Sequence, residues 1–157
     1  MISLKKRNNL GFTIVELLIV IVVIGILAGL VIVTYNGIQQ KARDTERKTD
    51  INALASHAEA FNAQNGKYPC LASTTSTCAD DFNASAFRSA NMKGLPDGAL
   101  QDPKGAASTL CGSVQANCYA YVPAPAGCDD ASNGDCSSYT LTATLESGGT
   151  YVKQSSN

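Results

Sequence analysis

One apolar stretch near the start of the chain constrains the fold more than any other feature. Residues 11–33 read GFTIVELLIVIVVIGILAGLVIV, and no charged residue occurs between Leu17 and Val33. A helix that spans a membrane needs about 20 apolar residues. The basic segment KKR at residues 5–7 precedes the stretch, and a basic flank favours the cytoplasmic side. The sequence therefore predicts a single-pass membrane helix with the following residues on the opposite side.

A carboxylate interrupts this apolar helix at Glu16. Such a residue costs on the order of 2.5–3.5 kcal/mol in lipid, so it usually has a partner and a function. A secretory signal would be cut at small residues after its apolar core, but Ala28-Gly29-Leu30 provides no such site. The small residue Gly11 lies before the core. A cut there would keep the helix and give Phe12 a free α-amine, with Glu16 partly unpaired nearby.

The segment KKRNNLGFTIVELLIVIVVIGILA closely resembles the N-terminus of type IV prepilins and pseudopilins. The matching residues are Gly11, Phe12, Thr13, Glu16, Leu17 and Gly25. The pattern is specific because a basic leader, a cut site, a lone glutamate and an apolar helix must all occur in this order. The resemblance implies removal of the leader by a prepilin peptidase and N-methylation of Phe12. An ordinary membrane anchor or an uncleaved signal anchor does not explain Gly-Phe followed by a lone Glu.

The resemblance implies a structural subunit of a type IV pilus, stored in the membrane and polymerised into a surface filament for adhesion, motility or DNA uptake. The alternative is a pseudopilin of a type II secretion or competence system, and a weaker alternative is a membrane-anchored binding module. The implied partners are further copies of the chain, other pilins, the prepilin peptidase, a membrane assembly platform and membrane lipid. The implied locations are the bacterial cytoplasmic membrane and the extracellular pilus.

The remaining composition agrees with an exported protein rather than a nucleic-acid-binding one. Without residues 1–11 the chain keeps nine Lys and Arg against thirteen Asp and Glu, so it has no strong basic footprint for nucleic acid. Gly25 and Gly29 form G-x-x-x-G, a signal for close packing between membrane helices. The charges in residues 41–50 are mixed in sign. A solvated helix face is the favoured interpretation, and pairing between subunits or contact with lipid headgroups is the alternative.

The helix is expected to continue well beyond the apolar stretch. Residues 34–65 contain no proline and a single glycine, Gly37. Apolar residues return at helical spacing, and these are Ile51, Leu54, Ala55, Ala58 and Phe61. Gly66 suits the position after a helix end, and Pro69 follows. The resulting domain boundaries are a leader at 1–11, a transmembrane and filament-core helix at 12–36, an amphipathic half at 37–65 and a globular head at 66–157.

The head shows the pattern of a small antiparallel sheet. Residues 82–92 predict a short helix capped by Asp80 or Asp81, with Phe82, Ala86, Phe87 and Ala90 facing inward. Residues 118–122, 138–146 and 150–153 predict strands, of which the second alternates apolar and polar residues. The predicted fold class is α+β, the type IV pilin fold, with a long N-terminal helix packed on a small antiparallel sheet.

Six cysteines follow the helix, which suggests disulfides in an oxidising compartment. They form three close couples: Cys70 with Cys78, Cys111 with Cys118, and Cys128 with Cys136. Six cysteines allow 15 connectivities, which a sequence does not distinguish. The sequential pairs are favoured because short loops close most easily. Zinc would need C-x₂₋₄-C pairs, and the sequence contains none.

The sequence contains no catalytic motif, so we do not expect an enzyme. The only histidine, His57, lies on the predicted helix and is interpreted as a packing or surface residue. The oxygen-rich segment that contains Asp129, Asp130, Asn133 and Asp135 is a candidate for calcium. Ala131 breaks the repeating ligand pattern and no glutamate closes it. A solvated turn is therefore favoured, and no cofactor is expected.

Overall fold

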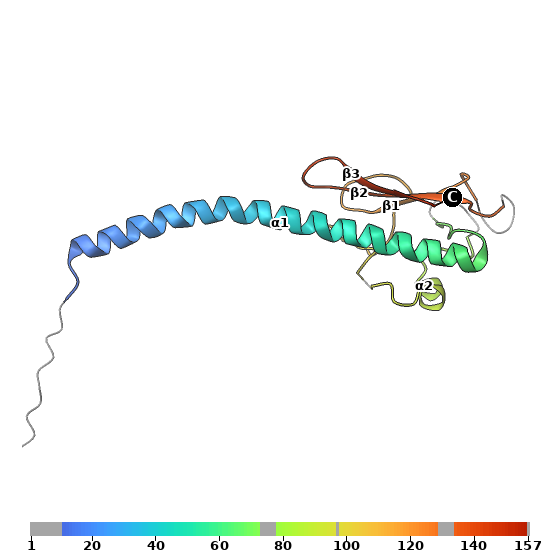
Figure 1. The fold of residues 1–157 in the computed structure, drawn as a ribbon, viewed down its shortest axis with the longest axis horizontal. Coiled ribbons are helices and arrows are strands. Elements are labelled where there is room, and N and C mark those ends of the chain that lie inside the picture. The colour runs from blue at the N-terminus through green and yellow to red at the C-terminus, as the bar shows by residue number, and fades with distance from the viewer. Residues whose placement is uncertain (1–10, 73–77, 97, 129–133, 157) are drawn as a thin grey trace, which may run out of the picture. The chain divides into compact units, whose positions relative to one another are not determined.

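The computed structural model describes residues 11–72, 78–96, 98–128 and 134–156. Its elements are α1 (Ile14–Asn65), α2 (Ser85–Asn91), β1 (Ala120–Ala124), β2 (Ser138–Thr144) and β3 (Thr150–Gln154) (Figure 1). The strands form one antiparallel sheet in the order β1-β2-β3. The predicted α+β fold, with a long N-terminal helix and a small antiparallel sheet, is confirmed.

The chain divides into two compact units, Met1–Gln39 and Gln40–Asn157. The described part of the first unit, residues 11–39, contains the apolar portion of α1. This helix is long and apolar enough to cross a membrane, and none of its most apolar window is buried within the protein. Its exposed apolar side chains therefore need lipid or other protein surfaces to cover them.

The second unit, which we call the head, is built around the C-terminal half of α1. Ile51, Leu54 and Phe61 are buried, as the apolar spacing predicts. The sheet lies on one side of this half of the helix and α2 lies on the other (Figure 1). On the sheet, Tyr139, Leu141 and Ala143 of β2 are buried with the helix stripe in one core. On the other side, the rings of Phe61 and Phe87 meet edge to face at 5.1 Å.

The short helix differs from its prediction in start, cap and inward face. It begins at Ser85, and its cap residue Ala84 makes no side-chain cap hydrogen bond. Asp81 does not cap it, because this carboxylate accepts hydrogen bonds from the backbone N–H groups of Ala72 and Asn83. Phe87 is buried as expected, whereas Ala86 and Ala90 are exposed. This seven-residue helix therefore buries one large ring rather than a full apolar face.

The strand boundaries shift by one or two residues from those predicted. β1 runs from Ala120 to Ala124 because Cys118 instead pairs with Gln115 in a tight turn. Pro123 fits within β1 because this is an edge strand of the sheet, where a missing N–H is tolerated. β2 ends at Thr144 because the N–H of Leu145 already closes the β2–β3 turn onto the carbonyl of Gly149.

The charged stretch at residues 41–50 is not a fully solvated face, so that interpretation is wrong in part. Arg47 is only 1% exposed and Asp44 only 4%. Both residues continue the spacing of the buried stripe by one and two helical turns before Ile51. Their side chains therefore enter the head, while Lys41, Glu46 and Lys48 remain exposed.

Arg47 is the centre of a buried charge network. Its Nε and Nη2 atoms donate to both carboxylate oxygens of Asp102, at 2.7 and 3.0 Å. Its Nη1 atom donates to Asp44 at 2.9 Å and to Glu146 at 3.0 Å. Asp44 in turn accepts the backbone N–H groups of Glu146 and Ser147. One guanidinium thus ties α1 to the Asp102 loop and to the β2–β3 turn.

The network shifts the pKa of each of its carboxyl groups. Burial raises the pKa of Asp44, but hydrogen bonds from Ser147, Glu146 and Arg47 outweigh it and lower that pKa to about 2. Burial also raises the pKa of Asp102, but hydrogen bonds from Arg47 and the N–H of Lys104 give a net lowering. Hydrogen bonds from the neighbouring cations lower the pKa of Glu146.

We expect the head to lose stability in acid through this network. A carboxyl group whose pKa is lower in the folded state stabilises the fold above its unfolded pKa of about 4. That stabilisation is lost as the pH falls through the folded value, which for Asp44 is about 2. Asp50 acts in the opposite direction, because burial raises its pKa. Denaturant unfolding at pH 7, 5, 4, 3 and 2 should show a decline that begins near pH 4. A constant midpoint down to pH 2 would contradict the network's role.

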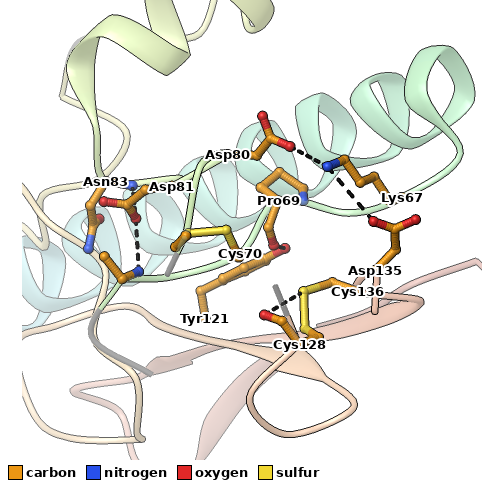
Figure 2. Close-up of a disulfide and its surroundings, with 12 residues drawn as sticks. Lys67, Pro69, Cys70, Asp80, Asp81, Asn83, Tyr121, Cys128, Asp135 and Cys136 are labelled. Carbon is orange, nitrogen blue, oxygen red and sulfur yellow. Dashed lines mark hydrogen bonds and ion pairs between the residues drawn. A yellow bond between two sulfur atoms is a disulfide. The ribbon is translucent and has the colours of Figure 1, made fainter. Parts of the chain in front are cut away.

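Three disulfides join the sequential couples that the short loops favour. They link Cys70 to Cys78, Cys111 to Cys118 and Cys128 to Cys136. The segment just after α1 runs through Pro69 into Cys70, with the Cys128–Cys136 disulfide nearby (Figure 2). There the Tyr121 hydroxyl donates to the carbonyl of Pro69 at 2.7 Å. The two disulfide loops are thus anchored beside the end of the helix.

A lysine just after α1 pairs with a carboxylate near each of these two disulfides. The Nζ atom of Lys67 lies 2.6 Å from a carboxylate oxygen of Asp80 and 3.8 Å from one of Asp135 (Figure 2). Asp135 was one of the calcium candidates, and it thus already faces a cation. The other candidates, Asp129, Asp130 and Asn133, lie outside the described residues, so the solvated turn stays a prediction, with calcium as its weaker alternative.

Candidate assembly site at the N-terminus

The start of α1 holds the residues on which the cut-site and assembly predictions rest. Gly11, Phe12 and Thr13 precede the helix, and Glu16 lies in its first turn. Phe12 is 90% exposed. The peptide bond between Gly11 and Phe12 therefore lies in a non-helical segment next to an exposed ring, which is a conformation that a peptidase can reach.

Thr13 and Glu16 form a capping box at this helix start. The backbone N–H and the hydroxyl of Thr13 donate to the Oε2 atom of Glu16 at 2.8 and 2.7 Å. The N–H of Glu16 donates back to the Thr13 hydroxyl oxygen at 3.2 Å. Such a box pairs backbone N–H groups that the first helical turn leaves without a partner.

This geometry refines the expectation that Glu16 is partly unpaired in the single subunit. One of its oxygens already has two donors within its own chain. The motif T-x-x-E at residues 13–16 is a sequence signal for such a box. Among the described residues nothing donates to the second carboxylate oxygen, which a cation from another chain can therefore approach.

Gly25 and Gly29 lie further along the exposed helix. A Cβ atom built on either glycine would meet nothing within 4 Å. Both positions therefore present bare backbone, on which a second helix could pack closely. Within the described residues they lie apart from the Thr13–Glu16 box, so the structure does not join them with it in one cluster.

Two comparisons with known sequences concern this same segment. A family model described as the prokaryotic N-terminal methylation motif matches residues 6–32. The chain is also 38% identical over 66 residues to the type II secretion system core protein G of Aeromonas hydrophila. That alignment covers 42% of this chain and 46% of the relative. No solved structure matches the chain.

Two further relatives are a second type II secretion protein and a type IV pilin. A type II secretion system core protein G of Dickeya chrysanthemi is 38% identical over 41% of this chain and 42% of its own length. The type IV major pilin protein PilA of Myxococcus xanthus is 30% identical over 55% of this chain and 40% of its own length. The chain thus spans less than half the length of each of these relatives. The resemblance to type IV pilins and pseudopilins is therefore confirmed: the chain carries the prokaryotic N-terminal methylation motif, and its relatives include type II secretion core proteins G and a type IV major pilin.

Proposed function

We propose that this chain is a structural subunit of a type IV pilus, stored in the membrane and polymerised through α1. The observation that supports this most is the match of residues 6–32 to the methylation motif, together with the uncovered apolar helix that follows it. Polymerisation would bury side chains that the single subunit leaves exposed, and apolar burial contributes about 25 cal/mol per Å². The role is structural rather than catalytic.

The proposal assigns a task to each part of the chain. A prepilin peptidase removes residues 1–11, and N-methylation of Phe12 follows. Residues 12–36 hold the subunit in the cytoplasmic membrane and later form the filament core, with Gly25 and Gly29 at helix contacts. Residues 37–65 continue the helix, and residues 66–157 complete the head outside the membrane. A membrane assembly platform moves the subunit from lipid into a filament with its copies and other pilins.

We expect replacement of Gly11 by valine to block processing. A larger side chain beside the cut bond would exclude the segment from the peptidase, while the leader and the apolar helix remain intact. The precursor should accumulate in the membrane fraction, where a gel resolves it from the shorter mature chain. Gly37→Val, on an exposed position of α1, is the matched control and should be processed normally. A mature Gly11→Val protein that begins at Phe12 would contradict the assigned cut site.

A pseudopilin is the second candidate, because several relatives are type II secretion core proteins G. Both candidates use the same assembly chemistry, so the N-terminus does not separate them. Electron microscopy of filaments sheared from cells, with mass spectrometry of their main subunit, tests the proposal. A pilus subunit should be abundant in long surface filaments. A chain that is absent from surface filaments, and whose deletion blocks protein secretion, would favour the pseudopilin and contradict the pilus.

A further inference from the structure

A hollow beside α2 has no role in the assembly mechanism. It has a volume of about 380 Å³, and its walls come from α2 and the segment that follows it. Its polar walls are Ser85, Arg88, Ser89 and Lys93, and its apolar walls include Met92 and Leu95. It lies on the side of α1 opposite the sheet, where α2 is drawn in Figure 1. None of its lining residues is acidic.

Two hydrogen bonds to backbone carbonyls hold the Arg88 guanidinium in place beside this hollow. Its Nη1 atom donates to the backbone carbonyls of Phe82 and Asn83, at 2.9 and 2.6 Å. A guanidinium carries five N–H donors, so those on Nε and Nη2 remain. They have no hydrogen-bond partner within the described part of the chain. The two carbonyls thus fix the plane of the guanidinium and leave one edge of the fork available.

Lys93 adds a second positive charge to the same hollow. It is exposed, and it also lines a neighbouring hollow of about 340 Å³ with His57 and Asn91. No acidic residue lines that hollow either. Neither Lys93 nor Arg88 forms an ion pair with a carboxylate of residues 11–72, 78–96, 98–128 or 134–156. The hollow thus combines two cations with no acidic lining residue, in a chain with a formal net charge of −1.

We propose that this hollow binds a phosphate monoester, such as a phosphorylated sugar. The two cations match the charge of about −1.5 to −2 that a phosphate monoester carries at neutral pH. The fixed guanidinium fork suits two phosphate oxygens, and the lysine suits a third as a point charge. The Ser85 hydroxyl lines the same space and can donate to a phosphate oxygen, whereas that of Ser89 already donates to the Ser85 carbonyl. The half-buried Leu95 can contact the carrier of the phosphate. A single carboxylate would leave one cation unmatched.

Equilibrium dialysis of the full-length chain in a non-ionic detergent, at fixed ionic strength, tests this site. The probes are inorganic phosphate, glucose 6-phosphate and a single-stranded oligonucleotide. We expect glucose 6-phosphate to bind, and Lys93→Gln to weaken it about tenfold, as for a hydrogen bond to a charged group. Lys41→Gln removes the same charge from an exposed helix position and should bind as well as the unmodified chain.

Ser85→Asp separates binding from folding. Ser85 is exposed, and its hydroxyl has no hydrogen-bond partner among the described residues. The change therefore adds a negative charge to the hollow without breaking a contact, and it should abolish binding while the unfolding midpoint stays unchanged. If inorganic phosphate alone binds, the ligand is the free ion, and this result would overturn the proposal of a monoester. Binding of the oligonucleotide alone, no binding of any probe, or equal binding by Lys93→Gln and Lys41→Gln would also overturn the proposal.

Discussion

Replacing Glu16 by alanine should abolish filaments while membrane insertion and removal of the leader continue. The substitution removes a carboxylate from an apolar helix, which favours insertion, and it leaves the Gly11-Phe12 bond unchanged. In the filament the open oxygen of Glu16 would meet the α-amine of Phe12 on a neighbouring subunit. That amine titrates near 8 and is positive at neutral pH. Breaking a buried pair costs about 3–5 kcal/mol, which is enough to disfavour each added subunit.

Two further variants separate the charge of Glu16 from its capping role. Glu16→Gln keeps an oxygen that can accept from Thr13, since glutamine also serves in a capping box, but it has no charge. If the charge aligns neighbouring subunits, Glu16→Gln should fail to polymerise as Glu16→Ala does. Glu46→Ala removes an exposed carboxylate from the head and should polymerise normally. The measurement is filament yield beside the processed subunit pool in membranes. Filaments of normal number and length from Glu16→Ala would refute the assembly role.

Replacing Arg47 by methionine should destabilise the head by about 3–5 kcal/mol, because it leaves buried carboxylates without their cation. The side chain of Arg47 is 1% exposed and pairs with Asp102 through two hydrogen bonds. A loss of this size is a large share of the 5–15 kcal/mol that holds a typical domain folded. Denaturant unfolding with the disulfides intact measures it, and Lys41→Met is the matched control at an exposed position.

A double variant identifies the source of that loss. If the loss arises because the buried Asp102 carboxylate has no cation, Arg47→Met with Asp102→Leu should recover part of the stability that Arg47→Met alone loses. If lost packing is the cause, the double variant should be less stable than either single one. An Arg47→Met protein that unfolds at the same denaturant concentration as Lys41→Met would show that the network contributes little to the stability of the head.

The parts of the fold that depend on local pattern were predictable. The apolar run, the stripe from Ile51 to Phe61 and the alternation in β2 each reflect the period of one element. Arg47 was missed because charges in a helix are read as solvated unless their partners are known. Asp102 and Glu146 lie 55 and 99 residues further along the chain. The spacing of Arg47 with the buried stripe was the one available signal.

In the assembly site, too, the local sequence pattern was predictable and the hydrogen bonds were not. Gly11, Phe12 and Glu16 were found because their order and spacing within a few residues form a specific motif. The hydrogen bonds that Thr13 gives to Glu16 were not predicted, because a carboxylate in an apolar helix is read first as a cost in lipid. The start of α2 was missed for a third reason. Asp81 is a good capping residue by type, but the N–H groups of Ala72 and Asn83 occupy its carboxylate.

Helical reconstruction of the assembled filament by cryo-electron microscopy tests the central claim most directly. The proposal predicts that the apolar part of α1 lies at the filament axis, away from solvent. It also predicts that the chain begins at Phe12, with that α-amine within 4 Å of Glu16 on a neighbouring subunit, the distance of an ion pair. A filament held together by its heads, with Glu16 distant from every α-amine, would contradict the account.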